Sequence, residues 1–457
     1  MTAAEAREAV ADVVGPLLER AVPPEAYRTA RARLADTVFA ALVGAGTQQG
    51  RAGAALAADL YGPADSLAGS LFRTVAAVRM TEIDDIDLLS CTTPGSVVIP
   101  TVLALVAHCP AVVSGERGAM EMALDAVIRG YDLVTGLGEA IDGPSRLAGG
   151  VWPTLAVAPV AACAIAGLLL GFDRARLERA IALAEPAVQT GNPRGNARET
   201  TLAAAVVAGV GAALAARRGF AVETDGRDGP LAALLRADAA ERGHGQSQIG
   251  RPAIKRFCSA RQVMTAVCAV RAMAGDGFDA AAIDRIVVEV PSAYARMIDK
   301  PTVASRRESL ASAHYQLAAA VTEPQRLLDV DRADLRLSPD LRAAMARISV
   351  RAAPDLDRDY PRHWPARVRI SAGGIERDAQ CDTVPGEGDC GVPALRDKFA
   401  AFLGVSDGLD ERLADEVLDR GTRGTGRDDL LALAGLLHPA PRERRTYDRC
   451  QSQRITA

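Results

Sequence analysis

The spacing of hydrophobic residues predicts one α-helix after another over roughly the first 260 residues. Leu34, Val38, Ala41 and Leu42 recur at helical intervals, and Gly44 behind them is a typical helix-ending residue. The same periodicity predicts helices at 100–107, 121–137, 154–170 and 201–216. The last two are rich in alanine and apolar on most faces, so they must pack on several sides, as in a layered helical bundle.

The pattern changes near residue 280, where apolar and polar residues begin to alternate. Residues 283–290 are also rich in β-branched side chains, which predicts a strand. Further strands are predicted at 345–351, 366–371 and 375–384, the last two joined across Gly373 and Gly374. Helices are expected between the strands at 310–321, 324–328 and 339–344. This mixture indicates a smaller α+β domain.

Helical periodicity returns at Pro393, a residue suited to a first helical position. Helices are predicted at 393–403, 408–419 and 428–437, and the charged tail from Pro439 is expected to be loose. We therefore predict a mainly α fold with two domains. In this prediction, residues 1–265 and 393–457 form a large, discontinuous, all-helical domain, and residues 266–392 form a smaller α+β lid domain.

Composition narrows the function without changing this architecture. A chain of 457 residues, 49% of them hydrophobic and 24% charged, is typical of a globular protein with two or three domains. The net charge of −4 is spread along the chain without a basic arm or stripe, and only 4% of residues are aromatic. Nucleic acid is therefore not an expected partner.

We expect a cytoplasmic location and no membrane partner. The N-terminus is acidic and amphipathic, and it lacks the basic-then-apolar order of a signal peptide. Residues 151–171 are uncharged and long enough to cross a bilayer, but they contain Pro153 and Pro159 and are rich in alanine. We predict a buried core helix there.

Neither a disulfide framework nor a local metal site is indicated. The eight cysteines form no CxxC pair, and the five histidines show no zinc-binding spacing. The basic residues are almost all arginine, which fits a GC-rich coding bias, and lysine occurs only as Lys255, Lys300 and Lys398. A lysine kept against this bias is of interest, because lysine can lose its proton when buried.

Four segments place polar groups among the apolar helices. The first, from Thr81 to Asp87, holds four carboxylates, which repel one another unless cations or solvent lie nearby. Behind it, Gly95 and Ser96 precede an apolar helix, where backbone N–H groups can bind an anion. A solvated acidic turn with an ordinary serine cap is the alternative interpretation.

The other three segments carry candidate cations and proton-transfer groups. In residues 189–201, Arg194 and Arg198 could each hold a carboxylate, or the segment could be a surface loop. In residues 254–262, Lys255 could perform chemistry that arginine cannot, or it could be a surface cation. In residues 308–318, His314 and Tyr315 could transfer protons, or they could pack at an interface.

These segments, in this order, resemble the MmgE/PrpD family, which includes 2-methylcitrate dehydratase, cis-aconitate decarboxylase and iminodisuccinate epimerase. The similarity extends from about Ala30 to Leu437, through EIDDID…TTPGSVVIP, GVWPTLAVAPVAACAIAGLLLGFD, KRFCSARQ and DKPTVASRRESLASAHYQLA. The resemblance implies a helical domain, an α+β lid and a homodimer. It also implies an active site between the domains that uses no metal and no organic cofactor.

The resemblance also assigns individual positions. Lys255 and Tyr315 fall on the family's lysine and active-site tyrosine, and Arg198 falls where many members have lysine. The family commonly has histidine before proline where this chain has Thr93 and Trp152, so the two histidines usually thought to move protons are absent. The acidic segment supplies Glu82, Asp84 and Asp85 where the family has a similar run.

The sequence thus predicts a lyase that removes water, or alternatively carbon dioxide, from a small carboxylate-bearing acid. Arg198 and Arg261 would neutralise a carboxylate so that a neighbouring proton becomes removable. Lys255 would stabilise the developing charge or take the proton, and Tyr315 or His314 would deliver a proton to the departing hydroxyl. The predicted site is completed by Asp84 as a catalytic residue and by Glu82, Asp85, Thr93, Ser96 and Trp152 as substrate contacts.

Other readings of the same site stay open. Trp152 in place of histidine adds an apolar wall, which favours a substrate bulkier or less charged than 2-methylcitrate, such as a secondary-metabolite carboxylate. An epimerase or isomerase would need the same carboxylate clamp without a leaving group. A non-catalytic relative that only binds a carboxylate would account for the missing histidines.

Overall fold

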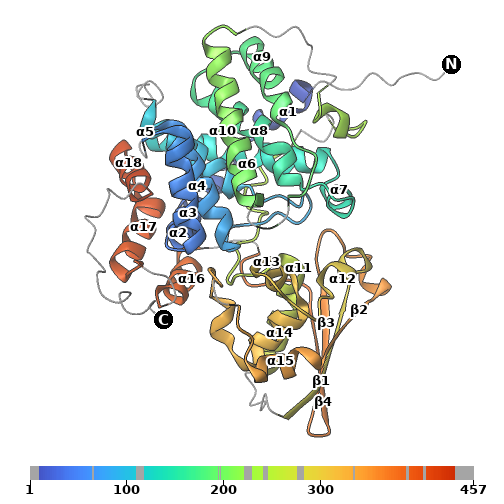
Figure 1. The fold of residues 1–457 in the computed structure, drawn as a ribbon. Helices are drawn as coiled ribbons and strands as arrows, with labels where there is room; N and C mark the ends of the chain where they lie inside the picture. The colour runs from blue at the N-terminus through green and yellow to red at the C-terminus, as the bar shows by residue number, and fades with distance from the viewer. Residues whose placement is uncertain are drawn as a thin grey trace, which may run out of the picture.

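The computed structural model describes residues 10–63, 66–109, 118–193, 195, 197–220, 229–239, 245–274, 282–332, 335–387, 391–404 and 408–437. Arg194 and the tail from Pro439 therefore lie outside the described residues. The described residues form a helical part and a smaller part with a sheet, shown one above the other in Figure 1.

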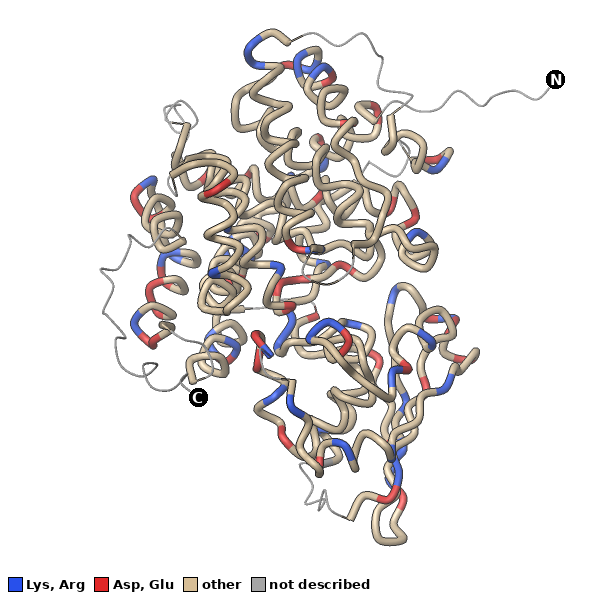
Figure 2. Tube along the Cα trace, viewed as in Figure 1, with Lys and Arg blue, Asp and Glu red and all other residues tan. Residues whose placement is uncertain are grey.

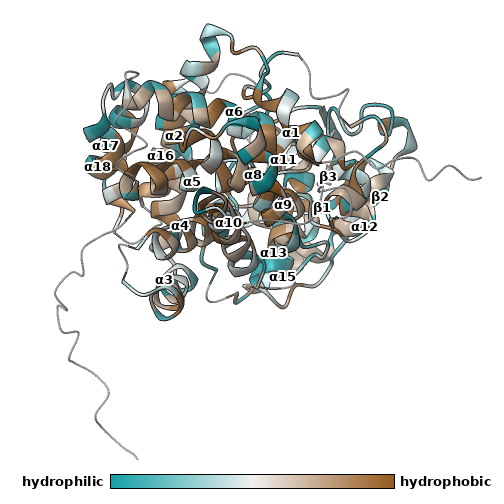
Figure 3. Ribbon diagram, turned by 90° about the horizontal axis from the view of Figure 1, so that it is seen from above, coloured by the Kyte–Doolittle hydropathy of each residue, from teal (hydrophilic) through white to brown (hydrophobic). Residues whose placement is uncertain are grey.

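The first half of the chain is helical, as its periodicity predicted, and its apolar side chains form the larger of two hydrophobic cores. Hydrophobic segments lie toward the interior in Figure 3, with hydrophilic segments around them. The elements are α1 (Val10–Leu18), α2 (Pro24–Ala45), α3 (Gln48–Tyr61), α4 (Leu67–Thr81), α5 (Gly95–His108), α6 (Ala119–Ala140), α7 (Gly143–Ala148), α8 (Pro153–Leu169), α9 (Arg174–Ala184) and α10 (Ala197–Arg217), with 3₁₀ turns η2 (Glu185–Ala187) and η3 (Ala232–Leu234).

One helix start was predicted wrongly. α5 begins at Gly95, and Pro100 lies inside the helix rather than at its start. Proline is usually confined to the first turn, because its ring removes a backbone hydrogen bond deeper in a helix. The start of α5 is therefore set by the turn at Pro94 and Gly95. Pro100, from which the start was predicted, lies inside the helix.

The apolar helices that could be mistaken for membrane spans lie in this core. Among the described residues, α10 is long and apolar enough to cross a membrane, but it packs against α4, α8 and α9. α8, which covers the uncharged stretch singled out in the sequence, is buried along almost its whole length. The prediction of a buried core helix there is confirmed.

The second part contains a four-stranded sheet with strand order β2-β1-β3-β4, in which β1 and β2 are parallel and the other pairs antiparallel. α11 packs on β3 and β4, and α14 packs on β2, so the inner face belongs to the smaller core. The elements are α11 (Arg261–Ala274), β1 (Ile283–Val290), α12 (Ser292–Ile298), α13 (Arg306–Ala311), α14 (Ala313–Thr322), η6 (Pro324–Leu327), α15 (Pro339–Ala346), β2 (Ile348–Ala352), η7 (Pro354–Leu356), β3 (Ala366–Ala372) and β4 (Ile375–Cys381).

The four predicted strands and the hairpin between β3 and β4 are confirmed, with shifted ends. β2 starts at Ile348 because α15 continues to Ala346. The single helix predicted at 310–321 is two helices, because Ser312 takes an extended conformation and its hydroxyl accepts the Tyr315 N–H at the start of α14.

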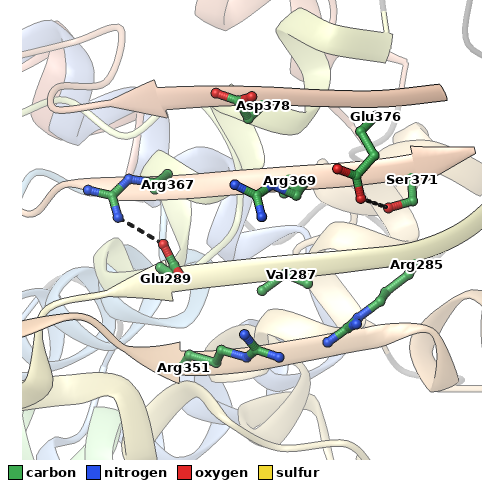
Figure 4. Close-up of a pocket in the computed structure, with 9 residues that line it drawn as sticks. All are labelled: Arg285, Val287, Glu289, Arg351, Arg367, Arg369, Ser371, Glu376 and Asp378. Atoms are coloured by element: carbon green, nitrogen blue, oxygen red, sulfur yellow. Dashed lines mark hydrogen bonds and ion pairs between the residues drawn. The ribbon is translucent and has the colours of Figure 1, made fainter.

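The outer face of the sheet carries charged side chains in rows across the strands. Figure 4 shows Arg367 paired with Glu289 at 2.9 Å, and the Ser371 hydroxyl donating to Glu376 at 3.1 Å. Arg285, Arg351 and Arg369 complete a shallow hollow on this face. Alternation of apolar and charged positions along each strand produces this division into a core face and a charged face.

The C-terminal helices α16 (Val392–Leu403), α17 (Glu411–Arg423) and α18 (Arg427–Leu436) lie against the first helices of the chain. Phe399 of α16 stacks on Phe39 of α2 at 3.8 Å between ring centroids. The predicted boundary at residue 265 falls inside the helix α11, whose Val263 and Met264 pack in the smaller core.

Candidate active site

The acidic segment after α4 is a buried turn whose carboxylates all have partners. It starts at Glu82, which takes a left-handed backbone conformation with φ of 53° at the end of α4. Asp84, Asp85 and Asp87 are at most 1% exposed. Asp87 binds the Arg251 guanidinium at 2.6 Å. The alternative of a solvated acidic turn is therefore wrong.

Three cations converge on Glu82. Its carboxylate accepts hydrogen bonds from Lys255 Nζ at 2.9 Å and Arg79 Nη2 at 2.7 Å, and Arg198 Nη1 lies 3.5 Å away. Burial acts to raise the pKa of Glu82, but the positive charges of Arg79, Lys255 and Arg198 outweigh it and hold that pKa well below its ordinary value. Glu82 is therefore ionised in the unliganded protein.

Asp84 belongs to the same cluster and lies behind the side chains that line the cavity. It pairs with Arg79, and its Oδ1 lies 3.7 Å from Lys255 Nζ. The ion pairs thus combine three cations with two carboxylates, and the buried carboxylate of Glu199 also acts on Arg198 and Arg79. These charges balance formally, so attraction for an anionic ligand depends on the further basic residues around the cluster.

The cluster opens into a cavity of about 560 Å³ where the helical part meets the smaller part. Figure 2 shows charged residues gathered at this junction. Among the described residues that line the cavity, Glu82 is the one acidic residue and seven are basic. The basic residues are Arg79, Arg198, Lys255, Arg261, Arg296, Lys300 and Arg307.

Trp152 supports one of these cations. The Arg198 guanidinium lies 4.0 Å from the centre of the Trp152 ring, and the Arg79 guanidinium lies 5.7 Å from it. Burial lowers the pKa of Arg198 to about 10, with Arg79 also lowering it, while Glu82 acts in the opposite direction. Arginine still carries its charge at that pKa, so the ring holds a charged group toward the cavity.

The N-terminus of α5 at Gly95 is not a free anion-binding site. The Gly95 N–H donates to Asp85 Oδ1 at 2.9 Å, and the Tyr131 hydroxyl donates to the other oxygen at 2.6 Å. A side chain at position 95 would collide with Thr37 and Asp85, which is why glycine stands there. The protein's own carboxylate fills this site, so Asp85 has a supporting role.

The predicted site residues divide into those that line the cavity and those behind it. Ser96 lies behind, fully buried, and donates to the Thr93 carbonyl at 2.7 Å. Asp84 and Asp85 also lie behind the lining side chains. The predicted residues that line the cavity are Glu82, Thr93, Trp152, Arg198, Lys255 and Arg261.

His314 and Tyr315 are not among the residues that line the cavity. Tyr315 is 1% exposed in the smaller core, with the Arg332 guanidinium 5.2 Å from its ring centre. His314 Nε2 lies 2.9 Å from Asp299, and its Nδ1 lies 3.2 Å from the Met345 carbonyl. In this structure neither side chain is placed to deliver a proton to a group beside Lys255, because α14 turns both into the lid.

Several cavity residues were not predicted from the sequence. Arg79 lies in the apolar, buried stretch from Val75 to Met80, where a charged residue signals a buried partner, and the partners follow at Glu82 and Asp84. Arg307 donates to the Pro193 carbonyl at 2.5 Å and so joins the smaller part to the loop before α10. No local pattern indicated this contact.

All three lysines of the chain lie at or beneath this site. Lys255 and Lys300 line the cavity. Lys398 of α16 is buried, pairs with Asp36 at 2.6 Å and donates to the Ile83 carbonyl at 2.7 Å, within the acidic turn. The last lysine therefore anchors the backbone that carries Glu82.

Comparison with known proteins supports the architecture. The MmgE/PrpD N-terminal domain matches residues 8–241, and the MmgE/PrpD C-terminal domain matches residues 257–420. A comparison with curated proteins gives no match. Across the described residues, no group of three or more His, Cys, Asp or Glu is arranged to hold a metal ion. Two adjoining domain matches cover most of the chain, and the protein therefore belongs to the MmgE/PrpD family.

Proposed function

We propose that this protein is a hydro-lyase that removes water from a carboxylate-bearing hydroxy acid by taking a proton beside the carboxylate. Membership of the MmgE/PrpD family supports an enzyme of dehydratase-like or related carboxylate chemistry. The observation that carries the proposal is the meeting of Lys255 and Arg198 at Glu82, on the wall of one cavity.

Substrate binding would use the excess of basic over acidic side chains that line the cavity. A substrate carboxylate can accept hydrogen bonds from Arg198 and Lys255 together, and it would share these cations with Glu82. The side chains of Lys255 and Arg79 are buried, so the attraction is stronger than it would be in water. Withdrawal of positive charge from Glu82 would also raise its basicity.

Glu82 and Lys255 then suit a proton-transfer pair. In our proposal, Glu82 takes the proton from the carbon beside the substrate carboxylate, and Arg198 stabilises the enediolate-like charge. The C–O bond breaks as the C=C bond forms, and Lys255 gives its proton to the leaving hydroxide, which departs as water. The proton on Glu82 returns to Lys255 across their 2.9 Å hydrogen bond, which restores both groups.

The test compares Lys255→Arg and Lys255→Met with wild type on a panel of hydroxy acids. We expect both variants to lose at least about a hundredfold in kcat, because arginine keeps the charge but does not release its proton. Lys255→Arg should keep most of the affinity for the acid, which separates binding from proton transfer. Arg396→Met, an exposed position away from the cavity, serves as the control.

Product mass identifies the reaction. Loss of water supports the proposal, whereas loss of carbon dioxide or an unchanged mass would mean decarboxylation or isomerisation in the same clamp. Unchanged turnover in both Lys255 variants would overturn the assigned roles. Tight acid binding without turnover of any panel member would indicate a non-catalytic relative.

We also propose, on the family resemblance, that the protein acts in the cytoplasm as a homodimer without a metal or organic cofactor. Light scattering on the full chain at micromolar concentration tests the assembly. A mass of one chain across that range would contradict it.

A further inference from the structure

One end of the cavity is built from aromatic rings of the smaller part. Tyr294, Tyr360 and Trp364 line it with ring centres 5.6–5.8 Å apart. The Tyr294 hydroxyl donates to the Pro365 carbonyl at 3.3 Å, and the Trp364 N–H donates to the Pro361 carbonyl at 3.2 Å. Because these two polar atoms are bound to backbone, the rings of Tyr294 and Trp364 present carbon to the cavity.

Apolar side chains continue this wall toward the opening. Leu147 of α7 packs against the smaller core and lines the cavity from the helical side. Met297 of α12 lines it from the other side and is 40% exposed, unusual for a large apolar side chain. Folding alone gives no reason to expose Met297, but an apolar group in the cavity would cover it.

The three cations around Glu82 and the aromatic rings belong to different walls, and a further cation, Arg261, lies 5.9 Å from the centre of the Trp364 ring. Lys255, Arg198 and Arg79 gather around Glu82 on the helical side, whereas the rings belong to the core of the smaller part. A volume of about 560 Å³ suits a ligand of drug-like size. A compact acid bound to the cations around Glu82 would make no contact with the aromatic wall.

We infer that the substrate is amphipathic. Its carboxylate binds the cations that surround Glu82, and a bulky aryl or alkyl group packs against Tyr294, Tyr360 and Trp364. This inference rests on the proposed function and specifies its substrate class. Apolar burial supplies the affinity for the tail, and the cations fix the orientation of the acid group. Compact tricarboxylates are then poorer ligands than monoaryl or alkyl diacids.

Calorimetric titration of the full-length protein tests the inference with three probes: succinate, 2-benzylsuccinate and citrate. We expect 2-benzylsuccinate to bind at least about tenfold more tightly than succinate, a difference of about 1.4 kcal/mol. Citrate should gain no such advantage. Equal affinity of the two succinates, or tighter binding of citrate than of 2-benzylsuccinate, overturns the inference while leaving the proposed acid clamp intact.

Matched variants locate the tail. Met297→Gln and Leu147→Gln should each reduce the advantage of 2-benzylsuccinate at least about threefold without changing succinate affinity. Ile375→Gln, at a more exposed apolar position on the hairpin (61% against 40% for Met297), should change neither. Arg198→Met should weaken both succinates alike. A tail advantage that survives in both glutamine variants would overturn the inference, and failure of every acid to bind would overturn the proposed function with it.

Discussion

The protonation of each buried carboxylate depends on the groups that its oxygen atoms contact. Glu82 and Asp85 are three residues apart in one turn, yet their pKa values move in opposite directions. Glu82 faces three cations, whereas burial dominates at Asp85. Two carboxylates in the same segment therefore serve two purposes, an ionised group in the cavity and a structural acceptor behind it.

Asp85 makes stability depend on pH. Burial raises its pKa from 3.8 to about 6, with Asp84 also raising it, against Arg33, Tyr131 and Gly95, which lower it. The folded chain therefore holds more protons at this site than the unfolded chain between pH 4 and 6. Its contribution to stability is fully present below pH 4 and falls by roughly 3 kcal/mol as pH rises through 6.

Asp85→Asn tests this prediction, because the amide still accepts the Gly95 N–H but does not titrate. The free energy of unfolding of the variant, relative to wild type, should rise by roughly 3 kcal/mol from pH 4 to pH 7, measured by urea denaturation. The exposed Asp415→Asn is the control. A difference that does not change with pH would contradict the raised pKa.

Trp152 should matter through its ring face and not only through its bulk. Trp152→Leu removes the π-surface beneath Arg198, so succinate affinity should fall about tenfold, within the roughly 0.5–2 kcal/mol of a cation–π contact. Trp152→Phe keeps a ring and should lose much less. Calorimetry measures both, with thermal unfolding to confirm the fold. Equal losses in the two variants would show that the ring face has no special role.

At the scale of helices, close approach of two backbones sets the geometry of the larger core. α8 and α10 pack so tightly that a side chain at Gly209 would come within 2.1 Å of the Pro159 carbonyl oxygen. At Gly211, on the same helix, an added Cβ atom would have no other atom within 4 Å. α10 also carries Arg198 at its start, so this contact helps to place a cavity residue.

The two glycines make a matched pair of tests. Gly209→Ala should destabilise the protein by about 1–3 kcal/mol, because the collision involves backbone and forces the helices apart. Gly211→Ala should stabilise it by about 0.5–1 kcal/mol through helix propensity. Urea denaturation measures both. A loss of stability in Gly211→Ala as large as that in Gly209→Ala would contradict the packing argument.

At the scale of the whole molecule, the cavity exists because two cores meet. Arg307 donates to the Pro193 carbonyl, and Arg306 donates to the Met80 carbonyl at the end of α4. The acidic turn is held in addition by Lys398, from the far end of the chain. Segments more than three hundred residues apart therefore determine the position of Glu82.

An acid ligand should consequently protect both sides of the cavity at once. With succinate near a hundredfold excess over its Kd, which adds about 2.7 kcal/mol of stability, hydrogen exchange should slow at 82–87 and at 292–300. The hairpin of β3 and β4, none of whose residues lines the cavity, is the internal control. Protection confined to one of the two segments would contradict a shared site.

Hydrophobic periodicity and local chemistry in the sequence predicted most of the helices, the strands and part of the cavity lining. Hydrophobic spacing is a property of neighbouring residues, so it predicted the helices and the four strands, and it failed at Pro100 and Ser312, where special backbone geometry prevails. Lys255 and Arg198 were predictable as cavity cations because each lies in a polar segment between apolar helices and falls on a position that the family resemblance singles out.

Only tertiary structure decided which polar groups meet. It turned Tyr315 into the smaller core, filled the Gly95 site with Asp85, and brought Arg79 and Arg307 to the cavity. These outcomes depend on contacts between segments far apart in the chain, and on which face of each helix is buried. Sequence determined the elements and the family, because those are written in local patterns, while the electrostatics of the site arose from packing.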